Sequence, residues 1–150
     1  MIPQSRTTRL FSHLLPVAML LATANLYADS PISMSLTGAA EIPPVTTTAS
    51  GKVNVSVLPN RTVSCTIDVT GMAPTMAHIH EGAVGKNGPP IIILVKKSDE
   101  VFTAPADAKL SEAQYISYLA GNLYVNVHSE AHPNGEIRAQ LPGKPIRIAH

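Results

Sequence analysis

Apolar and polar residues alternate with a period of two along most of this 150-residue chain, and this pattern constrains the fold more than any other feature. In one segment, for example, Val53, Val55 and Val57 are separated by single polar residues. Half-buried antiparallel strands show this alternation because successive side chains point to opposite faces of the sheet. The pattern predicts strands at 33–37, 52–58, 63–69, 75–81, 123–128 and 136–141.

Two further segments complete the predicted fold. The continuous apolar run at 90–95 fits either a strand covered on both faces or a tightly packed edge strand. Ser111 and Gln114 have the spacing of a capping box and Gly121 is a natural stop, so we expect a short helix at about 111–120. Turn residues separate the strands, and 58–61 is predicted to be a hairpin tip. The fold class expected is all-β, an antiparallel Greek-key β-sandwich or barrel with one short helical insertion.

The N-terminal segment has the pattern of a secretory signal peptide. Arg6 and Arg9 precede a short apolar stretch at 14–24, and Ala28 is a suitable cleavage site. Cleavage after Ala24 and a buried N-terminal helix are the alternatives. We therefore divide the chain into a signal peptide (1–28), one domain (29–142) and a C-terminal tail (143–150), and expect the protein to be periplasmic or secreted.

The charge balance excludes some classes of protein. The full chain has 11 basic and 10 acidic residues, and removal of 1–28 leaves 9 basic residues against 10 acids, a net charge of about −1. A nucleic-acid-binding face would need an excess of basic residues. The sequence also lacks an apolar run long enough for a polytopic membrane protein.

The single cysteine, Cys65, cannot form an internal disulfide. It alternates with Val63 and Ile67, which favours a buried, inert thiol over a reactive or metal-binding one.

Four of the six histidines form two clusters. His78 and His80 are two residues apart in a predicted strand, so their rings share a face. His128 ends another strand, and the turn at 133–135 can bring His132 back beside it. If these strands are neighbours, the four imidazoles converge on a metal site, with copper favoured over zinc. The alternative is histidines that only form hydrogen bonds on a half-buried surface.

Other residues are expected to support this site. A ligating ring should donate its second N–H to a carbonyl or carboxylate, and Glu81, Glu130 and Glu136 are candidate partners. Met72 and Met76 flank His78; packing is the favoured interpretation, and thioether contact with Cu(I) is the alternative.

Four segments of the sequence resemble the CHRD (chordin) domain family. They are LTGAAEIPPV (36–45), SGKVNVSVLPNRTVSCTIDVTGM (50–72), AHIHEGAVGKNGPPIIIL (77–94) and LSEAQYISYLAGNLYVNVHSEAHPNGEIRAQL (110–141). The resemblance implies an extracytoplasmic antiparallel β domain, found singly in bacterial secreted proteins and repeated in animal chordin. It also implies similarity to the Cu,Zn superoxide dismutase architecture. His78, His80 and His128 match the family pattern, whereas His132 is less regular.

Three functional hypotheses follow. The first is an exported CHRD-domain protein that binds one transition-metal ion, copper favoured, in copper handling or redox chemistry. The second is a copper-only superoxide dismutase-like enzyme in which Arg138 steers the anion by its charge, although such an arginine can instead bond neighbouring strands or loops. The third is a non-catalytic extracellular module that binds a protein partner. The sequence contains no motif that establishes catalytic turnover.

Overall fold

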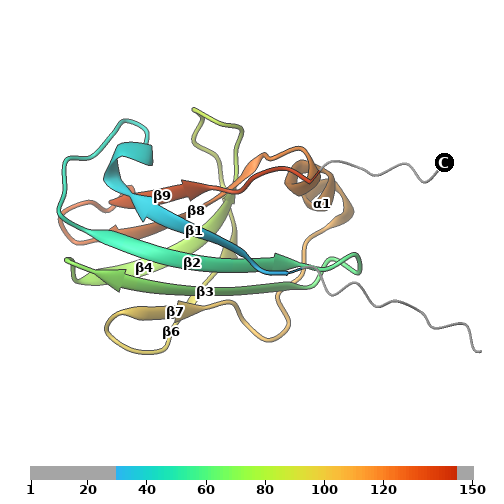
Figure 1. The fold of residues 1–150 in the computed structure, drawn as a ribbon, viewed down its shortest axis with the longest axis horizontal. Helices are drawn as coiled ribbons and strands as arrows, with labels where there is room; N and C mark the ends of the chain where they lie inside the picture. Colours follow the sequence, from blue (N-terminus) through green and yellow to red (C-terminus); the bar gives the residue numbers. More distant parts are fainter. Residues whose placement is uncertain (1–29, 145–150) are drawn as a thin grey trace, which may run out of the picture.

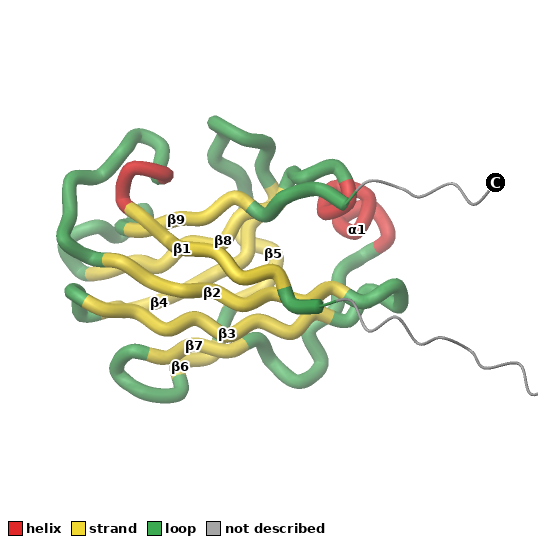
Figure 2. The backbone as a smooth tube through the Cα atoms, in the orientation of Figure 1, coloured by secondary structure: helices red, strands yellow, loops and turns green. Residues whose placement is uncertain are grey.

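A computed structural model of the chain describes residues 30–144. The expected signal peptide and residues 145–150 of the expected tail lie outside this range. The described residues form nine strands and one α-helix, shown in Figures 1 and 2. The strands are β1 (Ile32–Thr37), β2 (Ser50–Val57), β3 (Val63–Thr70), β4 (Pro74–Glu81), β5 (Pro90–Ile93), β6 (Val95–Lys96), β7 (Val101–Thr103), β8 (Leu123–Ser129) and β9 (Ile137–Gln140). The helix is α1 (Glu112–Leu119), and a short 3-10 turn, η1, spans Gly38–Ala40.

All nine strands belong to one antiparallel sheet in the order β5-β4-β8-β9-β1-β2-β3-β7-β6. The first and last strands of this order, β5 and β6, are separated along the chain by Leu94 alone. The two edges of the sheet therefore meet, and the sheet curls into a nearly closed, flattened barrel. The connections from β3 to β4 and from β7 to β8 join strands that are not neighbours, as in a Greek key. The predicted fold class is confirmed.

The alternating residues supply the core, as the period of two predicts. In β2, Val53, Val55 and Val57 are buried while the polar residues between them lie further out. In β3, Cys65 is 4% exposed within the core, and burial raises the pKa of its thiol to about 12. The thiol is therefore protonated and inaccessible, which confirms the interpretation of Cys65 as a structural residue.

The predicted hairpin and helix also form as expected. The backbone N–H of Leu58 donates to the carbonyl of Thr62 at 3.0 Å, which closes the β2–β3 hairpin. Ser111 and Gln114 make both hydrogen bonds of the capping box at the start of α1. Gly121 ends the helix with a φ of 79°, a conformation that glycine adopts without strain. No helix in the described part of the chain is long and apolar enough to cross a membrane.

Two features of the sheet differ from the sequence-based expectation. The apolar run at 90–95 is not one strand, because it bends at Leu94 and supplies both edges of the sheet, as β5 and β6. Its Ile93 is 69% exposed, as an edge position allows. The three-residue strand β7 was not predicted, since it is too short to show a period and forms by pairing with β3.

Candidate metal centre

The outward faces of β4 and β8 carry the candidate site. Ala77 and Ile79 of β4 point into the core, so His78 and His80 point outward. The two strands pair antiparallel, and the register sets His78 opposite Asn126 and His80 opposite Tyr124. In β8 the valines face the core, and Tyr124, Asn126 and His128 therefore share the outward face with the two histidines of β4.

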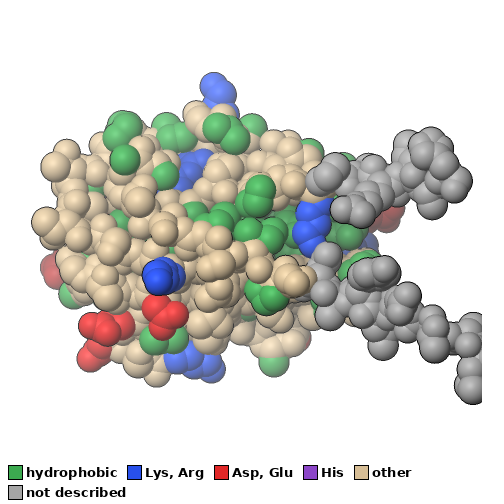
Figure 3. Space-filling model, in the orientation of Figure 1, with side chains coloured by type: hydrophobic (Ala, Val, Ile, Leu, Met, Phe, Trp, Pro, Cys, Tyr) green, Lys and Arg blue, Asp and Glu red, His purple; other side chains and the backbone are tan. Residues whose placement is uncertain are grey.

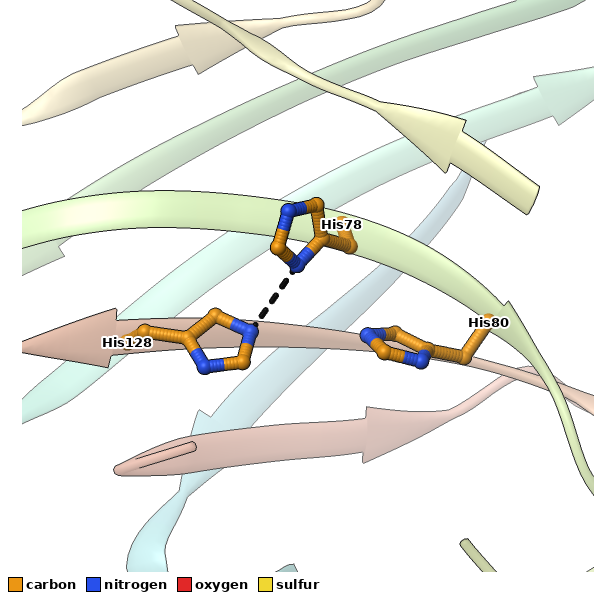
Figure 4. Close-up of side chains that lie close together, drawn as sticks. All are labelled: His78, His80 and His128. Atoms are coloured by element: carbon orange, nitrogen blue, oxygen red, sulfur yellow. Dashed lines mark hydrogen bonds between the residues drawn. The ribbon is translucent and has the colours of Figure 1, made fainter. Parts of the chain in front are cut away.

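Three imidazoles converge on this face. His78, His80 and His128 each offer a ring nitrogen, and these nitrogens all lie within 4.8 Å of one another. Figure 4 shows the His78 ring above the space between the other two rings, with a nitrogen of each ring facing that space. His78 Nδ1 and His128 Nε2 are 2.9 Å apart. Metal–nitrogen distances near 2 Å place the ligand atoms of one ion up to about 4 Å apart, so small side-chain rotations suffice to bind a metal.

Backbone carbonyls fix the protonation of two of the rings. His80 Nδ1 donates to the carbonyl of Gly88, and His128 Nδ1 donates to the carbonyl of Pro133, both at 2.9 Å. Because a carbonyl can only accept, both Nδ1 atoms carry the proton and each Nε2 presents its lone pair to the cluster. His78 Nδ1 is then the donor to His128 Nε2. His80 Nε2 is buried without a hydrogen-bond partner, so its lone pair is available to bind an ion.

Burial also keeps the three imidazoles neutral. The pKa of His78 is lowered to about 4, first by burial and then by repulsion from the charged forms of His128 and His80. Burial lowers the pKa of His80 and of His128 as well, against the opposing effect of the hydrogen bonds to Gly88 and Pro133. Neutral imidazole is the form that binds metal ions, so no ring has to lose a positive charge at neutral pH. Ligation through the cluster-facing Nδ1 of His78 requires only that its proton move to Nε2, which also frees the lone pair of His128 Nε2.

A stack of side chains holds the inner end of the cluster. The ring of His80 stacks on Tyr124 with centroids 4.7 Å apart, and the guanidinium of Arg138 lies 3.4 Å from the centroid of the Tyr124 ring. Arg138 is 2% exposed and donates to the Asn87 side chain and the Lys86 carbonyl at 2.9 and 2.8 Å. This arginine therefore bonds the β4–β5 loop to β9, and that loop carries the Gly88 carbonyl that orients His80.

The structure does not bring His132 into the three-histidine cluster. The chain turns back after β8 so that the carbonyl of Pro133, one residue further on, reaches His128. The electrostatic interaction of His132 is instead with Glu136. Burial acts to raise the pKa of the Glu136 carboxyl, but hydrogen bonds from Ser129 and Thr47, and then the interaction with His132, together outweigh it and lower the pKa.

The three glutamates expected to support the histidines do not partner the rings of the cluster in the described residues. Glu81 accepts a 2.5 Å hydrogen bond from Ser117 of α1, and Glu130 is exposed. Glu136 accepts from Thr47 and Ser129. Backbone carbonyls take the place that these carboxylates were expected to fill.

Two buried polar residues beside the cluster were not predicted. Asn126 is 2% exposed and Glu41, from the segment after η1, is 5% exposed. Burial raises the pKa of Glu41, and Arg138 and Asn126 oppose this rise. Asn126 shares the alternation of Tyr124 and His128, a signal that could have identified it. No sequence pattern marks Glu41, because it lies outside the strands and reaches the site only through the fold of its loop.

The fold and the cluster define an antiparallel β domain with three outward histidines on two neighbouring strands. Carbonyls of the adjoining loops orient two of the rings. The family model for the CHRD domain matches residues 32–141, and the chain belongs to the CHRD domain family. The predicted resemblance is thus confirmed over nearly all the described residues. Searches of curated proteins and of solved structures found no match.

Proposed function

We propose that this CHRD domain binds one transition-metal ion through His78, His80 and His128, and that it serves copper handling outside the cytoplasm. The observation that carries the proposal is the convergence of three neutral imidazoles, two of which are fixed in one tautomer by backbone carbonyls. The N-terminal signal pattern and the family membership support a periplasmic or secreted location.

The donor set favours copper over zinc. The cluster offers nitrogen donors, and the thiol of Cys65 lies in the core away from the outward face. For a given set of nitrogen ligands, copper binds more tightly than zinc in the Irving–Williams order. Zinc is the alternative ion. A bound copper would supply redox chemistry, while the residues of this chain hold the ion and exclude water on its inner side.

The structure gives less support to the dismutase-like enzyme. That hypothesis used Arg138 to attract an anionic substrate by its charge. Arg138 is instead buried, and its guanidinium is engaged by the β4–β5 loop and the Tyr124 ring. Its position fits a role in holding the loop.

Metal analysis of the exported protein tests the proposal. We expect one equivalent of copper by mass spectrometry, and tighter binding of Cu(II) than of Zn(II) by calorimetry. His80→Phe keeps an aromatic ring on Tyr124 but removes the ligand nitrogen, and should weaken copper binding by more than about 100-fold.

His132→Ala is the matched control, because His132 lies outside the cluster. It should leave the copper affinity within about twofold. Less than one equivalent of bound metal, or equal losses in the two variants, would overturn the proposal.

A further inference from the structure

We infer that Met76 is a fourth ligand of this site, through its thioether sulfur, and that the site is therefore selective for Cu(I). The inference rests on the proposed function, since it adds a donor to the three histidines. It concerns the oxidation state of the copper that the domain carries.

The register of the sheet places Met76 beside the cluster. Met76 lies directly opposite His128 in the β4–β8 pair, and it precedes His78 by two residues on β4. Opposite residues of an antiparallel pair have Cβ atoms about 4.5–5.5 Å apart, and residues two apart on a strand share a face. The irregularity of the pairing lies before Met76, between Pro74 and Met76, so the register from Met76 to the end of β4 is continuous. Met76 thus adjoins the two histidines that are hydrogen-bonded to each other.

Packing in the core does not account for Met76. Met34 and Met72 both pack against the hydrophobic core, whereas Met76 is 47% exposed on the outward face. The two methionines that flank His78 in the sequence are therefore distinguished by the structure. Met72 has a packing role, and Met76 has a free thioether beside the imidazoles.

Met76 also lies at the open side of the site. The Tyr124 and Arg138 stack and the β4–β5 loop cover the end of the cluster at His80. At the other end, His78 is half-buried, and its cross-strand neighbours are Asn126 in β8 and Ile93 in β5, while Met76 is its neighbour on the same face of β4. Ile93 has no donor atom and Asn126 is buried at 2% exposed, so Met76 is the neighbour that offers a donor on the open side.

The chemistry of this donor set selects the reduced ion. Thioether sulfur is a soft ligand that favours Cu(I), and it contributes little to the binding of Zn(II). Methionine has three rotatable side-chain bonds, so its sulfur can reach an ion held by neighbouring side chains. Three imidazoles and one thioether form a complete four-ligand set.

Met76→Leu tests the inference, because leucine keeps the size and apolar character of the side chain. We expect Cu(I) affinity, measured anaerobically by competition with a coloured Cu(I) chelator, to fall by about tenfold or more. Zn(II) affinity, measured by calorimetry, should stay within about twofold. The matched control Met72→Leu should change neither affinity.

A spectroscopic measurement on the unmutated protein gives an independent result. With 13C-labelled methionine methyl groups, added Ag(I), a redox-inert analogue of Cu(I), should shift the Met76 resonance and leave those of Met34 and Met72 in place. If copper binds but the Met76 resonance and the Met76→Leu affinity are unchanged, the inference is wrong and the three-histidine site stands. If the unmutated protein binds no copper, the proposed function fails and this inference fails with it.

Discussion

At the scale of single residues, the proton on each imidazole controls what the cluster can bind. The carbonyls of Gly88 and Pro133 hold the protons of His80 and His128 on Nδ1. A carboxylate partner would fix the tautomer equally well, but it would also favour the charged ring. Neutral carbonyls stabilise the imidazolium less than a carboxylate would, so burial outweighs them and the pKa values of His80 and His128 stay lowered, as a metal site needs.

These pKa values predict how the stability of the metal-free domain depends on pH. The pKa of His78 is about 4 in the folded protein and about 6.5 in the unfolded chain. Above pH 6.5 the ring is neutral in both states. As the pH falls from 6.5 towards 4, only the unfolded chain takes up the proton, so the free energy of unfolding decreases. We expect His78 to account for a loss on the order of 2 kcal/mol, after allowance for solvent screening.

Urea denaturation between pH 7 and pH 4, with a chelator present, measures this dependence. His78→Asn lacks the titrating group and should show a shallower decrease in the free energy of unfolding. Equal decreases in the two proteins would contradict the assigned pKa of His78.

At the scale of elements, the β4–β5 loop and β9 act together on the site. Arg138 of β9 donates to Asn87 and to the Lys86 carbonyl, and the same loop presents the Gly88 carbonyl to His80. The loop has little room to move, because a Cβ on Gly88 would lie 1.7 Å from the carbonyl oxygen of Glu81. The orientation of a ligand on β4 therefore depends on a strand two places away in the sheet.

Arg138→Met tests this coupling, since methionine can still cover the Tyr124 ring but makes no hydrogen bonds to the loop. It also leaves the buried Glu41 without its opposite charge. We expect a loss of about 3 kcal/mol in the free energy of unfolding. Amide hydrogen exchange in residues 82–89 should become faster, as measured by mass spectrometry.

Arg61→Met, at the tip of the β2–β3 hairpin, is the control for loss of an arginine. It should change the stability by less than about 0.5 kcal/mol and leave exchange in the loop unchanged. A loop that exchanges at the original rate in Arg138→Met would show that the arginine does not hold it.

At the scale of the whole molecule, the barrel closes at Leu94, the single residue between the two edge strands β5 and β6. Leu94 lies between β5 and β6, is 5% exposed, and its backbone N–H donates to the carbonyl of Ala77 in β4 at 3.0 Å. The edge strands of the sheet are short, and they meet each other rather than presenting two long free edges. The seam adjoins β4, the strand that carries His78 and His80, through this hydrogen bond.

Substitutions at two adjacent residues of the seam are expected to lower the stability by very different amounts. Leu94→Ala should lower the free energy of unfolding by about 2–5 kcal/mol, because it removes a buried side chain from the closure. Ile93→Ala should cost less than about 0.5 kcal/mol, since Ile93 is 69% exposed. Chemical denaturation of the two variants makes the comparison, and similar losses would mean that the closure does not depend on Leu94.

Much of the fold could be predicted because its signals are local. A period of two assigns each side chain of a strand to one face, so the core valines, the buried Cys65 and the shared face of His78 and His80 were all correctly predicted. The capping box at Ser111 and the stop at Gly121 are likewise encoded within a few residues. The six-residue run at 90–95 was ambiguous, since an apolar run does not show where it bends.

The sequence by itself thus determined the longer strands, their faces and the family, whereas the tertiary structure decided the short edge strands and what meets at the site. His78 and His128 are fifty residues apart in the chain, and their contact depends on the pairing of β4 with β8. The same pairing, together with the path of the turn after β8, brings the Pro133 carbonyl rather than His132 to the cluster and sets Met76 beside it. The physical reason is that strand register and loop return are set by packing between distant segments, which a local pattern does not contain.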